Sequence, residues 1–343
     1  MNSEYLSTAA KQLTKELLWK LAYRHRSDPD KADICLYSSR RGGSTLLMEI
    51  LAANRGMSFS DQPFGLYTAS GPNINRLPIF PYGQIYAPDE QELALIREYV
   101  DGLFAGEIPA NVPWKFWARG WYRRTDRMTL KITDAKGLAQ WFDESYRAHA
   151  LVMTRHPLAQ SLSVQRIGWQ VTGKGFLRNE AYRRDHLTPE LVEMCERIYA
   201  QGPSLTCHVL DWGLENLPLI KGLRDNPHWI HVSYEELVAD SSAVVSMLAR
   251  SMDLPDEARM LEVAGRPSRS TKRSSTAATV KNIRSKDVKD LLLGWRDKVE
   301  PALRDECFEV LDRLGVRLYG ADSPYPDTAE IGRPLPERVA ATG

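Results

Sequence analysis

A glycine turn followed by two hydroxyl residues is the part of this sequence best suited to binding an anion. Residues 34–51 begin as an apolar strand, turn at a Gly-Gly pair and continue as a helix. Backbone N–H groups of such a turn point inward, and the helix N-terminus adds its amides and the positive end of its dipole. The segment therefore predicts a phosphate-binding cradle, formed by Arg40, Arg41, Gly42, Gly43, Ser44 and Thr45.

This cradle differs from the loop of nucleotide triphosphatases, which reads G-x-x-x-x-G-K-[ST]. Ser44 stands where that loop has its Lys, and neither Leu36 nor Tyr37 supplies the glycine that begins it. The sequence therefore indicates an anion site of another kind. An ordinary strand, turn and helix with a Ser-Thr cap is the plainer alternative for this segment.

A second candidate anion site follows the apolar run 149–153. Arg155 comes directly after this strand, and open α/β sheets bind ligands at the carboxyl ends of their strands. Pro157 suits the first turn of a helix, and Ser163 lies eight residues beyond Arg155, two turns into that helix. Taken alone, these are ordinary surface features. Together with the first cradle, they predict a pair of anion sites.

Strand-like and helical patterns alternate along the chain. Apolar runs typical of strands cover 32–37, 129–132, 149–153 and 229–232. Helical patterns lie between and after them, at 44–54, 89–104, 136–146, 157–168, 189–226 in more than one piece, 241–252, 256–264 and 287–315. This alternation predicts an α/β fold with a central parallel sheet covered on both faces.

The expected domain organisation is simple. Residues 1–31 are expected to form an amphipathic helix, with Leu13, Leu17 and Leu21 on one side, that docks on its own domain or on a sister subunit in a homodimer. A helix lying on a membrane surface is the alternative. Residues 32–320 form one domain, whose irregular segments 60–88 and 266–286 are long enough to be substrate-side loops. Repeated Pro predicts an extended tail over 321–343.

Composition limits the classes of partner. The 343 residues include 45 Lys and Arg against 44 Asp and Glu, a formal charge of +1, which does not favour nucleic acid or an acidic membrane. We find no signal peptide and no run long enough for a membrane span. The cysteines lack the spacing of a zinc site or a disulfide framework, which favours reduced thiols and a cytoplasmic protein; they are Cys35, Cys195, Cys207 and Cys307.

The two anion motifs resemble those of sulfotransferases that use 3′-phosphoadenosine-5′-phosphosulfate (PAPS). In that family, S-x-R-S-G-[ST]-T-x-L is followed later by R-[DH]-P with a Ser eight residues after the Arg, as in residues 39–47 and 154–163 here. Residues 232–237 are similar to the family's Y-E-D-L turn, and Gly294, Trp295 and Arg296 to its G-x-W-[KR] helix. The resemblance covers about residues 32–318 and implies a P-loop-like, three-layer α/β/α fold.

The resemblance also implies how the donor is bound. Arg41 would contact the phosphosulfate bridge, residues 42–45 the 5′-phosphate, and Arg155 and Ser163 the 3′-phosphate. Tyr234 would belong to the same site, with a late basic segment that closes over the nucleotide through Arg269, Lys272 and Arg273. No metal is needed in principle, because the cradle itself neutralises the anion.

The catalytic base is harder to place, because the K-T-H signature of small-molecule members is missing. Glycan-type and trehalose-type members carry a carboxylate in an E-x-x-F-like segment, and Gln62 stands here where that Glu would fall. An amide cannot take a proton, so we predict Asp61 as the base and Asp134 as the second choice. An ordinary surface aspartate is the alternative for Asp61.

The sequence therefore predicts an enzyme that moves a sulfuryl group from PAPS to a hydroxyl of a small-molecule, glycan or lipid-like acceptor by in-line attack. The alternatives are a P-loop nucleotide kinase or other phosphotransferase, and a non-catalytic nucleotide-binding module on the same fold. A kinase should carry a loop Lys, which is missing here.

Overall fold

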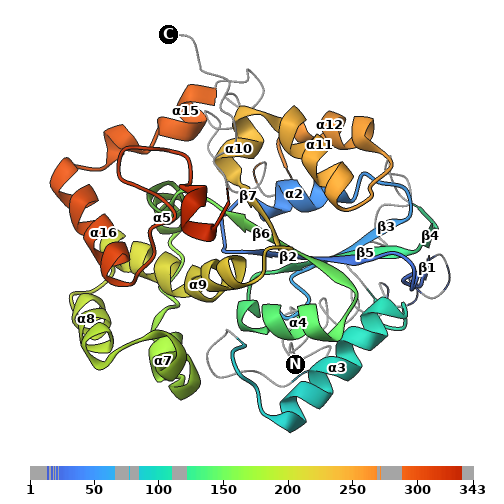
Figure 1. Ribbon diagram of the computed structural model, residues 1–343, viewed down its shortest axis with the longest axis horizontal. Coiled ribbons are helices and arrows are strands. Elements are labelled where there is room, and N and C mark those ends of the chain that lie inside the picture. The colour runs from blue at the N-terminus through green and yellow to red at the C-terminus, as the bar shows by residue number, and fades with distance from the viewer. Residues whose placement is uncertain are drawn as a thin grey trace.

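Five parallel strands form the central sheet of the protein. Their order is β3 (Met57–Asp61), β5 (Arg127–Ile132), β2 (Asp33–Ser38), β6 (Ala148–Thr154) and β7 (Ile230–Ser233) (Figure 1). The computed structural model describes residues 14, 17, 19, 21, 23–65, 77, 85–109, 122–268, 271 and 288–333. Strand β2 lies in the middle of the sheet, where Cys35 pairs with Leu130 on one side and Ala150 on the other.

Helices cover both faces of this sheet. On one face lie α2 (Ser44–Leu51), α10 (Tyr234–Ala239), α11 (Ser241–Ser251) and α12 (Glu257–Ala264) (Figure 1). The other face packs against α3 (Glu90–Phe104), α4 (Ala139–Ser145) and α9 (Leu205–Asp225). All six residues of β2 are buried, as a strand covered on both faces requires. The predicted α/β fold with three layers and a parallel sheet is confirmed.

The remaining elements extend the second face or close the ends of the domain. They are β1 (Arg24–His25) with β4 (Arg124–Thr125), η2 (Lys136–Leu138), α5 (Pro157–Arg166), α6 (Lys174–Arg178), α7 (Glu180–His186), α8 (Pro189–Ala200), α15 (Val288–Leu293), η3 (Arg296–Lys298), α16 (Pro301–Arg313) and η4 (Thr328–Ile331). Pro157 begins α5, as the sequence predicted.

Strand β3 was not predicted from the sequence, and its last two residues, Ser60 and Asp61, fall in the segment 60–88 that was expected to be irregular. Its residues alternate between apolar side chains and hydroxyls, but Ser58 and Ser60 are buried as fully as their apolar neighbours. The sequence therefore contains no apolar run that would indicate a strand here. In the structure, however, β3 pairs with β5 along its whole length. As a consequence, Asp61 stands at the carboxyl end of a strand and not within a loop.

The two ends of the described chain pack on the domain. Trp19 is buried, packs against Tyr23 with ring centroids 4.3 Å apart and the ring planes tilted by 40°, and donates from Nε1 to the Gly106 carbonyl at 2.8 Å. Leu17 and Leu21 are exposed. The expectation of an extended tail differs from the structure over 321–333, because the buried Ile331 anchors this segment. Residues 334–343 lie outside the described part of the chain.

The described cysteines Cys35, Cys195, Cys207 and Cys307 are free and buried. None of the helices in the described ranges has the length and apolar character needed to cross a lipid bilayer.

Candidate functional site

Three neighbouring strands end beside one another and carry the predicted anion-binding residues. The loop 39–43 follows β2, Arg155 follows β6, and Tyr234 follows β7. Since β2, β6 and β7 are adjacent and parallel, their carboxyl ends meet at one edge of the sheet. This is the edge at which open α/β sheets bind ligands.

The loop after β2 closes as a tight turn that only glycine permits at two positions. The Gly42 amide donates to the Ser39 carbonyl at 3.0 Å, and a Cβ added to Gly42 would lie 2.5 Å from Ser38 Oγ. Gly43 has φ 97°, a left-handed conformation, and its Cβ would lie 2.6 Å from the Tyr234 ring. Because the residue before α2 is a glycine, no cap side chain competes for the first amides of that helix.

Two arginines converge on this turn. Arg41 also adopts a left-handed conformation, with φ 64°, and its Nε donates to Ser163 Oγ at 3.1 Å. Arg155 donates to the Arg41 carbonyl at 3.2 Å, and its guanidinium lies 4.4 Å from the centre of the Tyr234 ring. The Nε of Arg155 is buried and has no hydrogen-bond partner among the described residues. The structure therefore brings Arg41, Arg155, Ser163 and Tyr234 together around the glycine turn.

These guanidinium groups oppose one another electrostatically. The pKa of Arg41 is lowered to about 10, first by burial and then by the charges of Arg155 and Arg166. Like charges held close together raise the free energy of the protein unless an anion lies between them. An N–H group with no partner, a helix N-terminus and crowded positive charges together form a site that fits a phosphate group.

Arg40 points away from this cluster, although it is the immediate neighbour of Arg41. Its guanidinium donates to the Gln170 carbonyl at 3.4 Å and to Thr172 Oγ1 at 3.3 Å, and it lies 5.3 Å from the centre of the Trp169 ring. The loop therefore presents two guanidinium groups on two different sides.

A lysine that the sequence interpretation did not assign to the site lies beside the cradle. Lys131, on β5, donates from Nζ to Thr45 Oγ1 at 3.5 Å and forms an ion pair with Asp61 Oδ1 at 2.5 Å. Asp61 and Lys131 are register partners on adjacent strands. One feature of the sequence could have indicated Lys131: it is a charged residue between apolar ones in a strand. Such a residue becomes buried when the strand is covered on both faces, and a buried lysine usually has a specific partner.

The two candidate bases lie in different surroundings. Asp61 sits next to the cradle through Lys131, and its side chain is 31% exposed, which leaves it accessible. At Asp134, burial raises the pKa of the carboxyl, against the opposing charge of Lys136. Gln62 donates from its amide to Thr133 Oγ1 at 3.1 Å, so the residue at the family's Glu position has a structural contact here.

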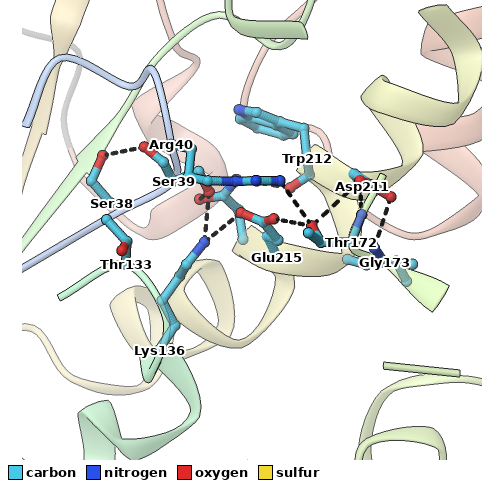
Figure 2. Close-up of polar contacts among 12 residues, drawn as sticks. Ser38, Ser39, Arg40, Thr133, Lys136, Thr172, Gly173, Asp211, Trp212 and Glu215 are labelled. Atoms are coloured by element: carbon cyan, nitrogen blue, oxygen red, sulfur yellow. Dashed lines mark hydrogen bonds and ion pairs between the residues drawn. The ribbon is translucent and has the colours of Figure 1, made fainter. Parts of the chain in front are cut away.

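A buried polar network lies behind the loop (Figure 2). Lys136 pairs with Glu215 at 2.7 Å and donates to Ser39 Oγ at 2.7 Å. Although burial alone would raise it, the pKa of Glu215 is lowered to about 2 by the charges of Lys136 and Arg40. Burial lowers the pKa of Lys136, and the charge of Glu215 opposes that shift.

Three of the residues that the sequence predicted to bind the sulfuryl donor have no described position. Arg269, Lys272 and Arg273 lie outside the described residues. Within the described ranges, no group of three or more His, Cys, Asp or Glu side chains is arranged to hold a metal ion.

No family model matches this sequence, and no curated protein matches it. Among solved structures, the sulfotransferase domain of the Synechococcus PCC 7002 olefin synthase is similar with a TM-score of 0.42 and 16% identity, covering 85% of this chain and 98% of that one. Mouse sulfotransferase SULT7A1 complexed with PAP gives 0.39 and 14%, over 86% and 87% of the two chains. The sulfotransferase from Alicyclobacillus acidocaldarius gives 0.39 and 14%, over 89% and 97%.

Each of these proteins is a sulfotransferase. The family named by the sequence motifs thus appears among the structural matches.

A buried carboxyl group lies directly behind Arg155. Glu235 Oε1 accepts a hydrogen bond from the His156 amide at 3.0 Å, and Oε2 accepts one from the Tyr319 hydroxyl at 3.1 Å. Burial raises the pKa of Glu235 from its ordinary value of 4.5 to about 7, against the hydrogen bond from His156 and the charge of Arg155. The folded protein therefore binds this proton more tightly than the unfolded chain does.

We expect Glu235 to make folding depend on pH. Because the folded-state pKa is raised, its contribution to stability is complete below about pH 4.5 and is lost as the pH rises through about 7. Glu235→Gln, which mimics the protonated form, should remove this loss, on the order of 3 kcal/mol at about 1.4 kcal/mol per pKa unit. Urea unfolding of both proteins at pH 5 and pH 8 measures it. An exposed Glu309→Gln control should keep the wild-type slope, and equal slopes for all three proteins would contradict the assignment.

Proposed function

We propose that this protein is a PAPS-dependent sulfotransferase. The observation that carries the proposal is the convergence of Arg41 and Arg155 on the glycine turn, where the buried Nε–H of Arg155 has no hydrogen-bond partner in the part of the chain that the structure describes. Such a group is stabilised by a hydrogen bond to an anion, and the like charges around it favour a ligand with more than one negative charge. PAPS is such a ligand, and it supplies the sulfuryl group.

In this proposal, the two phosphate groups of PAPS bind at two places in the site. The Gly42 amide already donates to the Ser39 carbonyl, so the amides of residues 43–45, at the N-terminus of α2, bind the 5′-phosphate end, where Arg41 neutralises the phosphosulfate bridge. Arg155 and Ser163 bind the 3′-phosphate, and Tyr234 holds the guanidinium of Arg155 from the other side. Lys131 adds a further positive charge beside Thr45, where charge develops as the sulfuryl group leaves.

Asp61 acts as the base in this proposal. Lys131 contacts both Asp61 and Thr45, so Asp61 lies near the loop on the side of β3 and β5. Part of its carboxylate remains accessible. The ion pair with Lys131 orients the carboxylate toward the cradle. Asp134 remains the second candidate, since its raised pKa also suits proton transfer. The acceptor is a hydroxyl of a small molecule, a glycan or a lipid-like compound.

Thermal unfolding with nucleotides tests the donor. Adenosine 3′,5′-bisphosphate (PAP), the product left by PAPS, should raise the melting temperature, since a ligand at 100 times its Kd stabilises a protein by about 2.7 kcal/mol. ATP at the same concentration should do less, because it lacks the 3′-phosphate that Arg155 and Ser163 bind. Stabilisation by ATP with magnesium instead would favour a phosphotransferase. No stabilisation by PAP would contradict the proposal.

Transfer of label from sulfur-labelled PAPS to a panel of hydroxyl compounds tests catalysis separately. Labelled product from at least one acceptor is expected. Binding of PAP without any transfer across the panel would favour a nucleotide-binding module without activity.

A further inference from the structure

The ion pair between Lys136 and Glu215 is buried more deeply than a surface salt bridge. Relative exposure is 3% for Lys136 and 5% for Glu215, and their charged atoms are 2.7 Å apart. Removing two charges from water is unfavourable, and a buried pair often contributes little to stability compared with apolar side chains of similar size. The position of this pair, directly behind the anion loop, suggests a role in the site.

Lys136 forms a hydrogen bond with Ser39, the first residue of the loop. Its Nζ donates to Ser39 Oγ at 2.7 Å, and Ser39 Oγ in turn donates to Asn216 Oδ1 at 3.4 Å. The carbonyl of the same serine accepts the Gly42 amide, which closes the turn. Any movement of Ser39 would therefore shift the turn that carries Arg41 in its left-handed conformation.

Glu215 connects the lysine to the opposite side of the loop. Its Oε1 accepts a hydrogen bond from Thr172 Oγ1 at 2.8 Å, and the same hydroxyl accepts one from Arg40 at 3.3 Å. The amides of Thr172 and Gly173 donate to Asp211, one turn before Glu215 on α9, at 2.5 and 2.9 Å. Figure 2 shows this chain of contacts from Lys136 through Glu215 to Thr172 and Asp211.

We infer that Lys136 is a positioning residue for the anion loop, kept charged and in place by Glu215. Its contact with Ser39 fixes the turn before any ligand arrives, so that the amides of residues 43–45 already point inward. The part of the inference that concerns the ligand rests on the proposed function, since PAP is the ligand whose binding the fixed turn would favour. The part that concerns the loop does not depend on it.

A double variant separates this role from a purely structural one. Lys136→Met alone would leave Glu215 buried without a partner and is expected to destabilise the fold. Lys136→Met with Glu215→Met replaces the pair by apolar side chains of similar length, which is often close to neutral for stability. The double variant still lacks the donor to Ser39. Ser39→Ala removes the same contact from the other side and leaves the ion pair in place.

Hydrogen–deuterium exchange of the loop without ligand is the first measurement. Loss of a hydrogen bond from a charged donor should speed exchange in peptides covering residues 40–46 by about tenfold or more in both variants. Peptides from α11 and α16 should exchange as in the wild type. The exposed pair Arg317 and Asp312, 3.0 Å apart, supplies a control, because replacing both by Met should leave loop exchange unchanged.

Titration with PAP is the second measurement. Both variants should bind PAP about tenfold more weakly, with melting temperatures near that of the wild type. Wild-type exchange in the loop, or faster exchange with unchanged PAP affinity, would overturn the inference. If the wild-type protein itself does not bind PAP, the proposed function fails, and the exchange rates alone then decide whether Lys136 positions the loop.

Discussion

Replacing Arg155 by Ala should weaken the binding of PAP by a factor of about 100 or more. Arg155 offers the 3′-phosphate a guanidinium whose buried Nε–H has no partner among the described residues. A hydrogen bond to a charged group contributes about 1.5–3 kcal/mol, and each 1.4 kcal/mol corresponds to a tenfold change in Kd. Because Arg155 offers both a charge and at least one such bond, its removal should be among the largest single effects on affinity. Calorimetric titration measures it directly.

Controls separate loss of the ligand contact from loss of the fold. Arg155 also donates to the Arg41 carbonyl and packs on Tyr234, so its removal affects the loop as well. Arg155→Lys keeps the charge without the planar fork and should recover part of the affinity. Arg250→Ala, on the exposed side of α11, should bind PAP as the wild type does. Unchanged PAP affinity in Arg155→Ala would place the 3′-phosphate elsewhere.

Replacing Asp61 by Asn should lower kcat by about 10² to 10⁴ while PAP still binds. An amide keeps the size of the carboxylate and its position beside Lys131, but it cannot accept the proton of the acceptor hydroxyl. Since the negative charge next to Lys131 is also lost, PAP affinity should be unchanged or higher. The test combines steady-state transfer of labelled sulfate, using the first acceptor that gives product, with PAP titration.

Two further variants serve as controls for Asp61→Asn. Asp305→Asn, an exposed site on α16, should leave kcat unchanged. Asp134→Asn should lower kcat much less than Asp61→Asn. The reverse order would make Asp134 the base, and near-normal kcat in Asp61→Asn would remove Asp61 from that role.

The elements that the sequence predicted well are those with a local signal. The middle of strand β2, residues 34–37, is a continuous apolar run, and the glycines after it allow the tight turn that follows. Pro157 similarly signalled the start of α5, which places Ser163 on the side of Arg41. In each case, the decisive information lies within a few consecutive residues.

Contacts that depend on the order of the strands in the sheet could not be predicted from the sequence. Asp61 and Lys131 are 70 positions apart and meet only because β3 pairs with β5. Lys136 and Glu215 likewise meet only when α9 packs beside η2. Nor does the sequence distinguish the directions of Arg40 and Arg41, because the left-handed conformation at Arg41 turns their side chains apart.

A crystal structure with PAP bound is the most direct test of how the donor is bound. We expect the 3′-phosphate between Arg155 and Ser163, and the 5′-phosphate against the amides of residues 43–45 at the start of α2. We also expect the Nε of Arg155 to acquire a phosphate oxygen as its partner. A bisphosphate bound away from the glycine turn, or a crystal that takes up no PAP at saturating concentration, would contradict the proposed binding mode.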